Sequence, residues 1–182
     1  MNTALLIIDI QNDYFPDGEM ELAGAVEAGT LASRALAAFR EKSLPVIHVQ
    51  HIATHPGATF FLPDTPGVEI NDCVSPRAGE LVIPKHFPNA FRDTPLLEHL
   101  ERLGITRLVV VGMMTHMCID TSVRAAADLG FECFLAHDAC ATKAQSYGSV
   151  TVSAQGVQAA FLAAIDGAFA KVLSVDEISS FV

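Results

Sequence analysis

Positive charge is scarce in this sequence. Lys and Arg number 11 against 21 Asp and Glu, so the 182-residue chain has a formal net charge of −10 at pH 7. Proteins that bind nucleic acid present clusters of Lys and Arg to the phosphate backbone. The deficit therefore argues against nucleic acid as a partner.

Paired cysteines, a leader segment and a membrane span are also missing. The cysteines form no C-x-x-C pair and show no zinc-ligand spacing, which favours a reducing compartment. The first residues carry no basic stretch or cleavage site, and no apolar run approaches the ~18 residues that a membrane span needs. We therefore expect a cytoplasmic protein without a membrane partner. The four cysteines are Cys73, Cys118, Cys133 and Cys140.

Alternating strand and helix patterns fill the chain, which is 51% apolar and 18% charged. Short runs rich in Val, Ile and Leu, typical of strands buried on both faces, alternate with helical patterns. This alternation predicts an α/β fold with one domain over residues 1–182, in which an open parallel sheet carries helices on both faces in three layers. We expect strands over 4–10, 46–50, 81–84, 107–111, 132–136 and 171–174, and helices over 23–42, 94–103, 119–129 and 152–169. Residues 176–178 are expected to form a surface tail.

The stretch from Val109 to Cys118 breaks an apolar run at Gly112 and places a cysteine near the start of the next predicted helix. The unpaired N–H groups and positive dipole end of a helix start favour a thiolate. A lone cysteine after a strand is more often a buried apolar residue. However, Asp9 and Lys85 also end predicted strands, and the ligand site of a parallel sheet lies beyond the carboxyl ends of its strands. The sequence thus predicts that a nucleophile, a carboxylate and a lysine converge there.

Three histidines, His48, His51 and His55, lie in or just after the second predicted strand. Imidazole is a common ligand of zinc and iron, so a metal site is one interpretation. In a strand, however, His48 and His51 would point to opposite faces, and no Asp or Glu lies among the three. We predict no metal and no cofactor, and we regard a place in a substrate pocket as the better interpretation for one of these histidines.

The irregular segment 56–79 carries Phe60 and Phe61 between prolines and glycines. Loops of this length in a compact domain often form a lid, a binding wall or a contact between subunits. The two aromatic rings are candidates for an apolar pocket wall or a dimer surface, and plain packing beneath the loop is an equal alternative.

Three ordered motifs in this sequence resemble the isochorismatase-like cysteine hydrolases. The first is Leu-Leu-Ile-Ile-Asp-Ile-Gln-Asn-Asp-Tyr-Phe at 5–15, and the second is Val-Ile-Pro-Lys ending at Lys85. The third is Val-Val-Val-Gly-Met-Met-Thr-His-Met-Cys at 109–118. The segments 125–131 and 137–140 are similar to the family's next helix and strand, so the resemblance covers nearly the whole chain.

The resemblance implies a catalytic triad of Asp9, Lys85 and Cys118. It also implies a cis peptide between Met113 and Met114, an oxyanion hole made by the backbone N–H groups of Met114 and Cys118, and a homodimer or homotetramer. Candidate walls of the substrate pocket are Gln11, Phe15, His51, Phe60, Phe61, Phe91, Thr115 and Met117.

Within the family, the residues favour the metal-free amidohydrolases. Nicotinamidases have a metal-binding Asp-x-His pair after the second strand, whereas 49–55 contains no Asp, and isochorismatases proper lack the nucleophilic cysteine. The chain is more similar to streptothricin hydrolase and N-carbamoylsarcosine amidohydrolase, which implies hydrolysis of a small amide, carbamoyl or lactam C–N bond. Alternatives are a metal-assisted nicotinamidase-like deamidase, a thiol redox or sensing protein that pairs Cys118 with Cys140 or Cys73, and a non-catalytic small-molecule binder.

Overall fold

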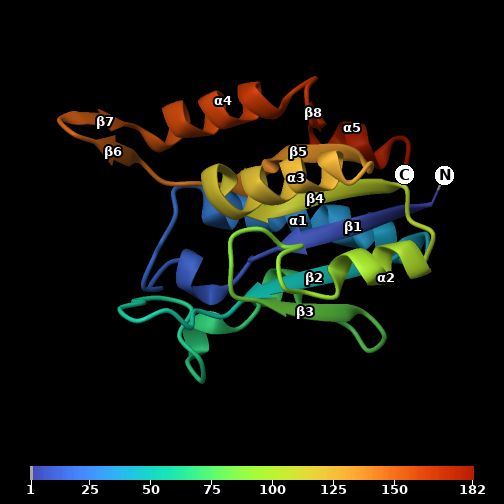
Figure 1. Ribbon diagram of the computed structural model, residues 1–182, viewed down its shortest axis with the longest axis horizontal. Helices are drawn as coiled ribbons and strands as arrows, with labels where there is room; N and C mark the ends of the chain where they lie inside the picture. The colour runs from blue at the N-terminus through green and yellow to red at the C-terminus, as the bar shows by residue number, and fades with distance from the viewer. Residues whose placement is uncertain (1) are drawn as a thin grey trace.

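Six parallel strands form a central sheet in the computed structural model, which describes residues 2–182 (Figure 1). The order is β3-β2-β1-β4-β5-β8, so the predicted α/β fold with an open parallel sheet is confirmed. The strands are β1 (Thr3–Ile8), β2 (Val46–His51), β3 (Leu81–Lys85), β4 (Arg107–Met113), β5 (Glu132–Ala141) and β8 (Lys171–Leu173).

Helices cover both faces of the sheet because its inner strands are apolar on both faces. In β1, Leu5 and Ile7 face one core, and Leu6 and Ile8 face the other, as the two-residue period of a strand requires. Helices α1 (Ala25–Glu41) and α5 (Val175–Ser179) contribute to the first core. Residues of α2 (Leu96–Arg102), α3 (Asp120–Asp128) and α4 (Ala154–Ile165) contribute to the second.

The chain departs from the predicted pattern after residue 136. Strand β5 continues to Ala141, and a two-stranded antiparallel hairpin follows, formed by β6 (Gln145–Tyr147) and β7 (Val150–Val152). The hairpin projects beyond the body of the molecule (Figure 1). Helix α4 therefore starts two residues later than predicted, where the Ser153 hydroxyl accepts the N–H of Gly156. Among the described residues, no helix is both long and apolar enough to cross a bilayer.

The predicted surface tail is wrong, because residues 175–179 form helix α5. Ser174 and Glu177 close a capping box at its start, and Val175 and Ile178 are buried in the core. The Asp138 carboxylate accepts the N–H of Val175 at 2.9 Å. This hydrogen bond joins residues that are 37 positions apart, so a local sequence pattern does not reveal it.

Gly112 lies near the carboxyl end of β4, where it is still paired with both β1 and β5. Its φ is 136°, and a Cβ there would lie 1.9 Å from the carbonyl oxygen of Ile8 in β1. The register between β4 and β5 shifts between Val110 and Gly112. Only glycine permits this close approach of two backbones, and it sets the start of the turn that carries Cys118.

Candidate active site

Three strand ends bring Asp9, Lys85 and Cys118 together at the carboxyl edge of the sheet. Lys85 Nζ lies 2.7 Å from Asp9 Oδ2 and 3.2 Å from Cys118 Sγ. Asp9 and Lys85 are fully buried, and only 6% of Cys118 is exposed. The structure therefore places the three residues in one buried cluster, where the strand-end rule expects a ligand site.

Two different backbone features set Asp9 and Cys118 in place. Asp9 follows β1 with a φ of 54°, a left-handed conformation that Asp tolerates better than most residues, and its N–H donates to Val49 at 2.9 Å. The peptide bond between Met113 and Met114 is cis. The carbonyl of Met114 then accepts the N–H groups of Met117 at 3.0 Å and Ile119 at 3.3 Å, which closes a turn over Thr115–Ile119.

Cys118 thus lies in a π-helical turn just before α3. A position at a helix start was expected to favour the thiolate, but the surroundings of Cys118 shift the pKa of its thiol in the opposite direction. Burial raises the pKa of the Cys118 thiol far above its usual value, Asp9 raises it further, and Lys85 only partly opposes them. With so little water contact, the positive end of a helix does not compensate for the loss of hydration. These shifts favour the thiol over the thiolate at Cys118.

Asp9 is the carboxyl of this cluster. Burial raises the pKa of its carboxyl, although Lys85 and Cys118 oppose the shift. Burial alone would lower the pKa of Lys85, but the nearby Asp9 and Cys118 outweigh it and raise that pKa, so Lys85 stays an ammonium. The cluster therefore combines a neutral nucleophile, a carboxylate of increased basicity and a fixed positive charge.

His51 is a third partner of Lys85, a contact that the sequence analysis missed. Its Nδ1 lies 2.8 Å from Lys85 Nζ, and the two residues are register partners at the ends of β2 and β3. Burial, followed by the Lys85 charge, lowers the pKa of His51 to about 3. The register of two adjacent strand ends is the signal that could have found this pair.

The three histidines of the metal hypothesis do not converge. His48 Nε2 lies 3.0 Å from Glu80 Oε2, and His55 is exposed with its Nδ1 3.3 Å from the carbonyl of Pro56. Among the described residues, a different group, Asp9, His51 and Cys118, offers three ligand atoms within 4.8 Å of one another. The Lys85 ammonium already contacts all three residues, and its charge would repel a metal ion there.

Comparisons with known proteins agree with this fold. A family model described as the isochorismatase domain matches residues 3–177. The chain belongs to the isochorismatase family.

Several relatives of this isochorismatase-family protein support the assignment. It is 47% identical to the isochorismatase family protein YddQ of Bacillus subtilis over 97% of this chain and 98% of YddQ. A solved structure from Oleispira antarctica, assigned to the isochorismatase hydrolases, superposes with a TM-score of 0.95 at 47% identity, over 98% of this chain and 96% of that one. A streptothricin hydrolase of Streptomyces noursei is 35% identical over 76% of this chain but only 49% of its own length.

Several residues expected in the pocket of this family member instead support the backbone. Gln11 is fully buried, and its amide donates to the carbonyls of His51 and Val68 and accepts the N–H of His51. The buried Thr115 hydroxyl donates to the carbonyl of Ala141 at 3.2 Å. These contacts give the polar groups of Gln11 and Thr115 a structural role, and their place in a substrate pocket stays a prediction.

The phenylalanines expected to line the pocket lie in two places, in the hydrophobic core and beside His51. Phe15 is buried in the core, and Phe91 stacks on Phe131 with ring centroids 6.2 Å apart, so both have packing roles. Phe61 is buried with its ring 5.8 Å from that of His51, and Phe60 packs against Phe61 at 4.9 Å.

Met117, next to Cys118, is 42% exposed, so it is the pocket candidate that reaches the surface most freely. The loop 56–79 thus places its aromatic pair beside His51.

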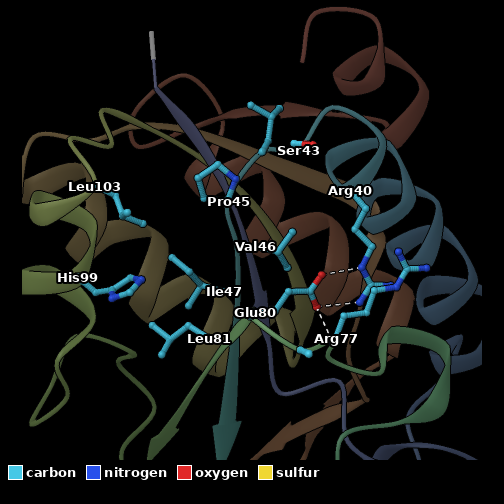
Figure 2. Close-up of a pocket in the computed structure, with 13 residues that line it drawn as sticks. Arg40, Ser43, Pro45, Val46, Ile47, Arg77, Glu80, Leu81, His99 and Leu103 are labelled. Carbon is cyan, nitrogen blue, oxygen red and sulfur yellow. Dashed lines mark hydrogen bonds and ion pairs between the residues drawn. The ribbon is translucent and has the colours of Figure 1, made fainter.

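A separate cavity of about 790 Å³ lies at the opposite edge of the sheet, at the amino ends of β2 and β3 (Figure 2). Glu80 lies at its centre and accepts two hydrogen bonds from Arg40, at 2.7 and 2.8 Å, and one from the N–H of Arg77 at 2.9 Å. These bonds, with that to His48, hold the pKa of Glu80 down to about 2. The cavity lies at the opposite edge of the sheet from Cys118, and the ion pair of Glu80 with Arg40 inside it joins the start of β3 to α1.

Glu80→Gln is expected to destabilise the protein at pH 7 by about 1 to 3 kcal/mol, because charge-assisted bonds to Arg40 become neutral ones. A carboxyl with a lowered folded-state pKa contributes stability above its unfolded pKa of about 4.3 and loses it as pH falls toward 2. The difference between parent and variant in urea unfolding should therefore shrink between pH 7 and pH 3. Glu132→Gln, which alters the more exposed pair with Arg107, is the matched control and should cost under about 1 kcal/mol.

Proposed function

We propose that this isochorismatase-family protein is a cysteine hydrolase that cleaves a non-peptide C–N bond in a small amide, carbamoyl compound or lactam. The observation that carries the proposal is the buried contact of Cys118 Sγ with Lys85 Nζ, which also pairs with Asp9. The similarity to a streptothricin hydrolase supports a small-molecule substrate.

The first half of the reaction forms a thioester. Asp9 takes the proton of the Cys118 thiol as Sγ attacks the carbonyl carbon, and the Lys85 ammonium stabilises the developing negative charge. The backbone N–H groups of Met114 and Cys118 receive the oxyanion. Asp9 then gives its proton to the leaving nitrogen, and the C–N bond breaks to release ammonia or an amine.

The second half restores the enzyme. Asp9 takes a proton from a water molecule as its oxygen attacks the thioester carbon. The C–S bond breaks to release the carboxylic or carbamic acid, and the proton on Asp9 returns to Cys118. The raised pKa values of Asp9 and Cys118 suit this exchange, because each group can hold the proton in turn.

A screen of small amides, ureas and lactams for release of ammonia or amine tests the proposal. We expect at least one class to be hydrolysed by the parent protein without added metal, with a thioester on Cys118 trapped by rapid acid quench and mass spectrometry. Hydrolysis that appears only with added zinc or iron would contradict it in favour of a metal-assisted deamidase. An intramolecular disulfide at Cys118 after mild peroxide, with no hydrolysis, would favour a thiol redox protein.

A further inference from the structure

The Lys85 ammonium has three N–H donors and three neighbouring acceptors. Nζ lies 2.7 Å from Asp9 Oδ2, 2.8 Å from His51 Nδ1 and 3.2 Å from Cys118 Sγ. An ammonium accepts no hydrogen bond, so His51 Nδ1 must be the acceptor and the ring proton must lie on Nε2. Each N–H of Lys85 thus has one close neighbour, and the neighbour on the β2 side is the imidazole nitrogen of His51.

The main chain of His51 is held as firmly as its ring. Gln11 accepts the N–H of His51 at 2.8 Å and donates to its carbonyl at 2.9 Å. The ring is half-buried beside that of Phe61, and the other titratable groups near it are His55 and His86. This places Nδ1 at a fixed point on the side of Lys85 formed by β2.

We propose that His51 is a positioning residue of the hydrolase: it accepts the third hydrogen bond of Lys85 and so fixes the ammonium between Asp9 and Cys118. The inference rests on the proposed function for its role in turnover. Without the acceptor, a buried N–H of Lys85 is unpaired, which disfavours the ammonium and weakens its support of the thiolate. The low pKa of His51 keeps its imidazole neutral, so this role persists across the physiological pH range.

Alkylation of Cys118 by iodoacetamide across pH tests this contact without any substrate. We expect His51→Leu to slow alkylation at pH 7 roughly tenfold and to move the thiol titration to higher pH, since a one-unit pKa change is a tenfold change in thiolate. His51→Asn, whose side-chain oxygen can approach the position of Nδ1, should stay within about threefold of the parent. His55→Leu, at an exposed neighbour, is the matched control and should behave as the parent does.

The outcomes separate the contact from the overall function. Parent-like alkylation of His51→Leu, or an equally slow His51→Asn with parent-like circular dichroism, would overturn the positioning role. On an active substrate, His51→Leu should lower kcat with KM little changed. If no amide is hydrolysed by the parent, the proposed function fails, while the alkylation profiles still decide whether His51 supports Lys85.

A second observation concerns the β6–β7 hairpin, which is apolar on one face and uncharged throughout. No charged residue lies between Lys143 and Asp166, in a chain with a net charge of −10. Tyr147 is opposite Val150 in the antiparallel register, and they are 92% and 62% exposed. Val152 lies on the same face by the two-residue period, whereas Ser146 and Thr151 bond to each other on the other face. An isolated hairpin with such a face is marginally stable in water.

The apolar face borders a hollow beside the candidate active site. A cavity of about 360 Å³ is lined by the hairpin, by Phe161 of α4 and by His116, two residues before Cys118. Helix α4 continues the uncharged surface with exposed alanines at 159, 160, 163 and 164. The hairpin, the hollow and α4 together form one surface, which we call the arm surface.

We infer that the arm surface binds a second copy of this chain, through the same surface on each copy. Two copies of a protein with a net charge of −10 repel each other wherever charged faces meet, and the arm surface is an extended region where neither copy presents charge. Within the described sheets, β6 and β7 pair only with each other, so each has a free edge on which a second hairpin can pair about a two-fold axis. The partner would then lie beside Met117 and the Cys118 turn.

Sedimentation velocity at about 10 μM tests the arm surface. We expect the parent to sediment as a dimer or larger even-numbered assembly, and the double variant Tyr147→Asp with Val150→Asp to fall to the monomer mass with unchanged circular dichroism. Val26→Asp, at an exposed valine on α1, is the matched control and should keep the parent mass. A monomeric parent, a double variant that keeps its assembly, or a control that also dissociates would overturn the inference.

Discussion

Cys118→Ala is expected to lower kcat/KM for amide hydrolysis by about 10⁴-fold or more, the range found when a triad nucleophile is removed from other enzymes. The sulfur is the atom that forms the covalent bond in the proposed reaction, and among the described residues no other thiol contacts Lys85. Initial rates of ammonia or amine release from the best substrate of the screen measure the loss. The thioester signal in the acid-quenched protein should vanish as well.

Stability should change little in this variant, because alanine leaves only the small space of one buried sulfur atom. Cys133→Ala is the matched control: Cys133 is also a buried thiol with a raised pKa, but it lies at the start of β5, at the opposite edge of the sheet. It should keep parent-like activity. A Cys118→Ala protein that still hydrolyses the substrate at the parent rate would disprove the thioester mechanism, and equal losses in both variants would indicate damage to the fold.

Asp9→Asn is expected to reduce the rate by about 10² to 10⁴-fold, the usual contribution of a general acid–base. The amide has nearly the shape of the carboxyl but cannot take the Cys118 proton. It also leaves Lys85 without its charged partner at 2.7 Å, and breaking a buried ion pair by removing one partner costs about 3 to 5 kcal/mol. Thermal unfolding should therefore show a lower Tm alongside the loss of activity.

The pH profile separates these two effects. In the parent, activity should fall as pH drops through the raised pKa of Asp9, because a protonated carboxyl cannot accept the thiol proton. The residual activity of Asp9→Asn should lack this acidic limb. Asp138→Asn, which keeps an acceptor for the N–H of Val175, is the control and should retain both the limb and the rate. An unchanged acidic limb in Asp9→Asn would assign the proton transfer to another group.

Local patterns were sufficient for the architecture and for the three central residues. Runs such as 4–8 and 108–111 are apolar at every position, a pattern typical of strands buried on both faces of a parallel sheet. Once the strands are placed, the carboxyl-edge rule brings Asp9, Lys85 and Cys118 to one edge without any further information. Their roles in catalysis stay a prediction.

Only the tertiary structure decided which distant residues contact each other and how deeply each residue is buried. The hydrogen bond from Lys85 to His51, the helix that Asp138 helps to cap, and the structural role of Gln11 each join segments more than 30 residues apart. The resting thiol of Cys118 is likewise a result of burial, which local sequence does not specify. The sequence by itself determined which residues lie at the edge of the sheet. The fold decided their protonation states and partners, because pKa values and hydrogen bonds depend on what surrounds a group in space.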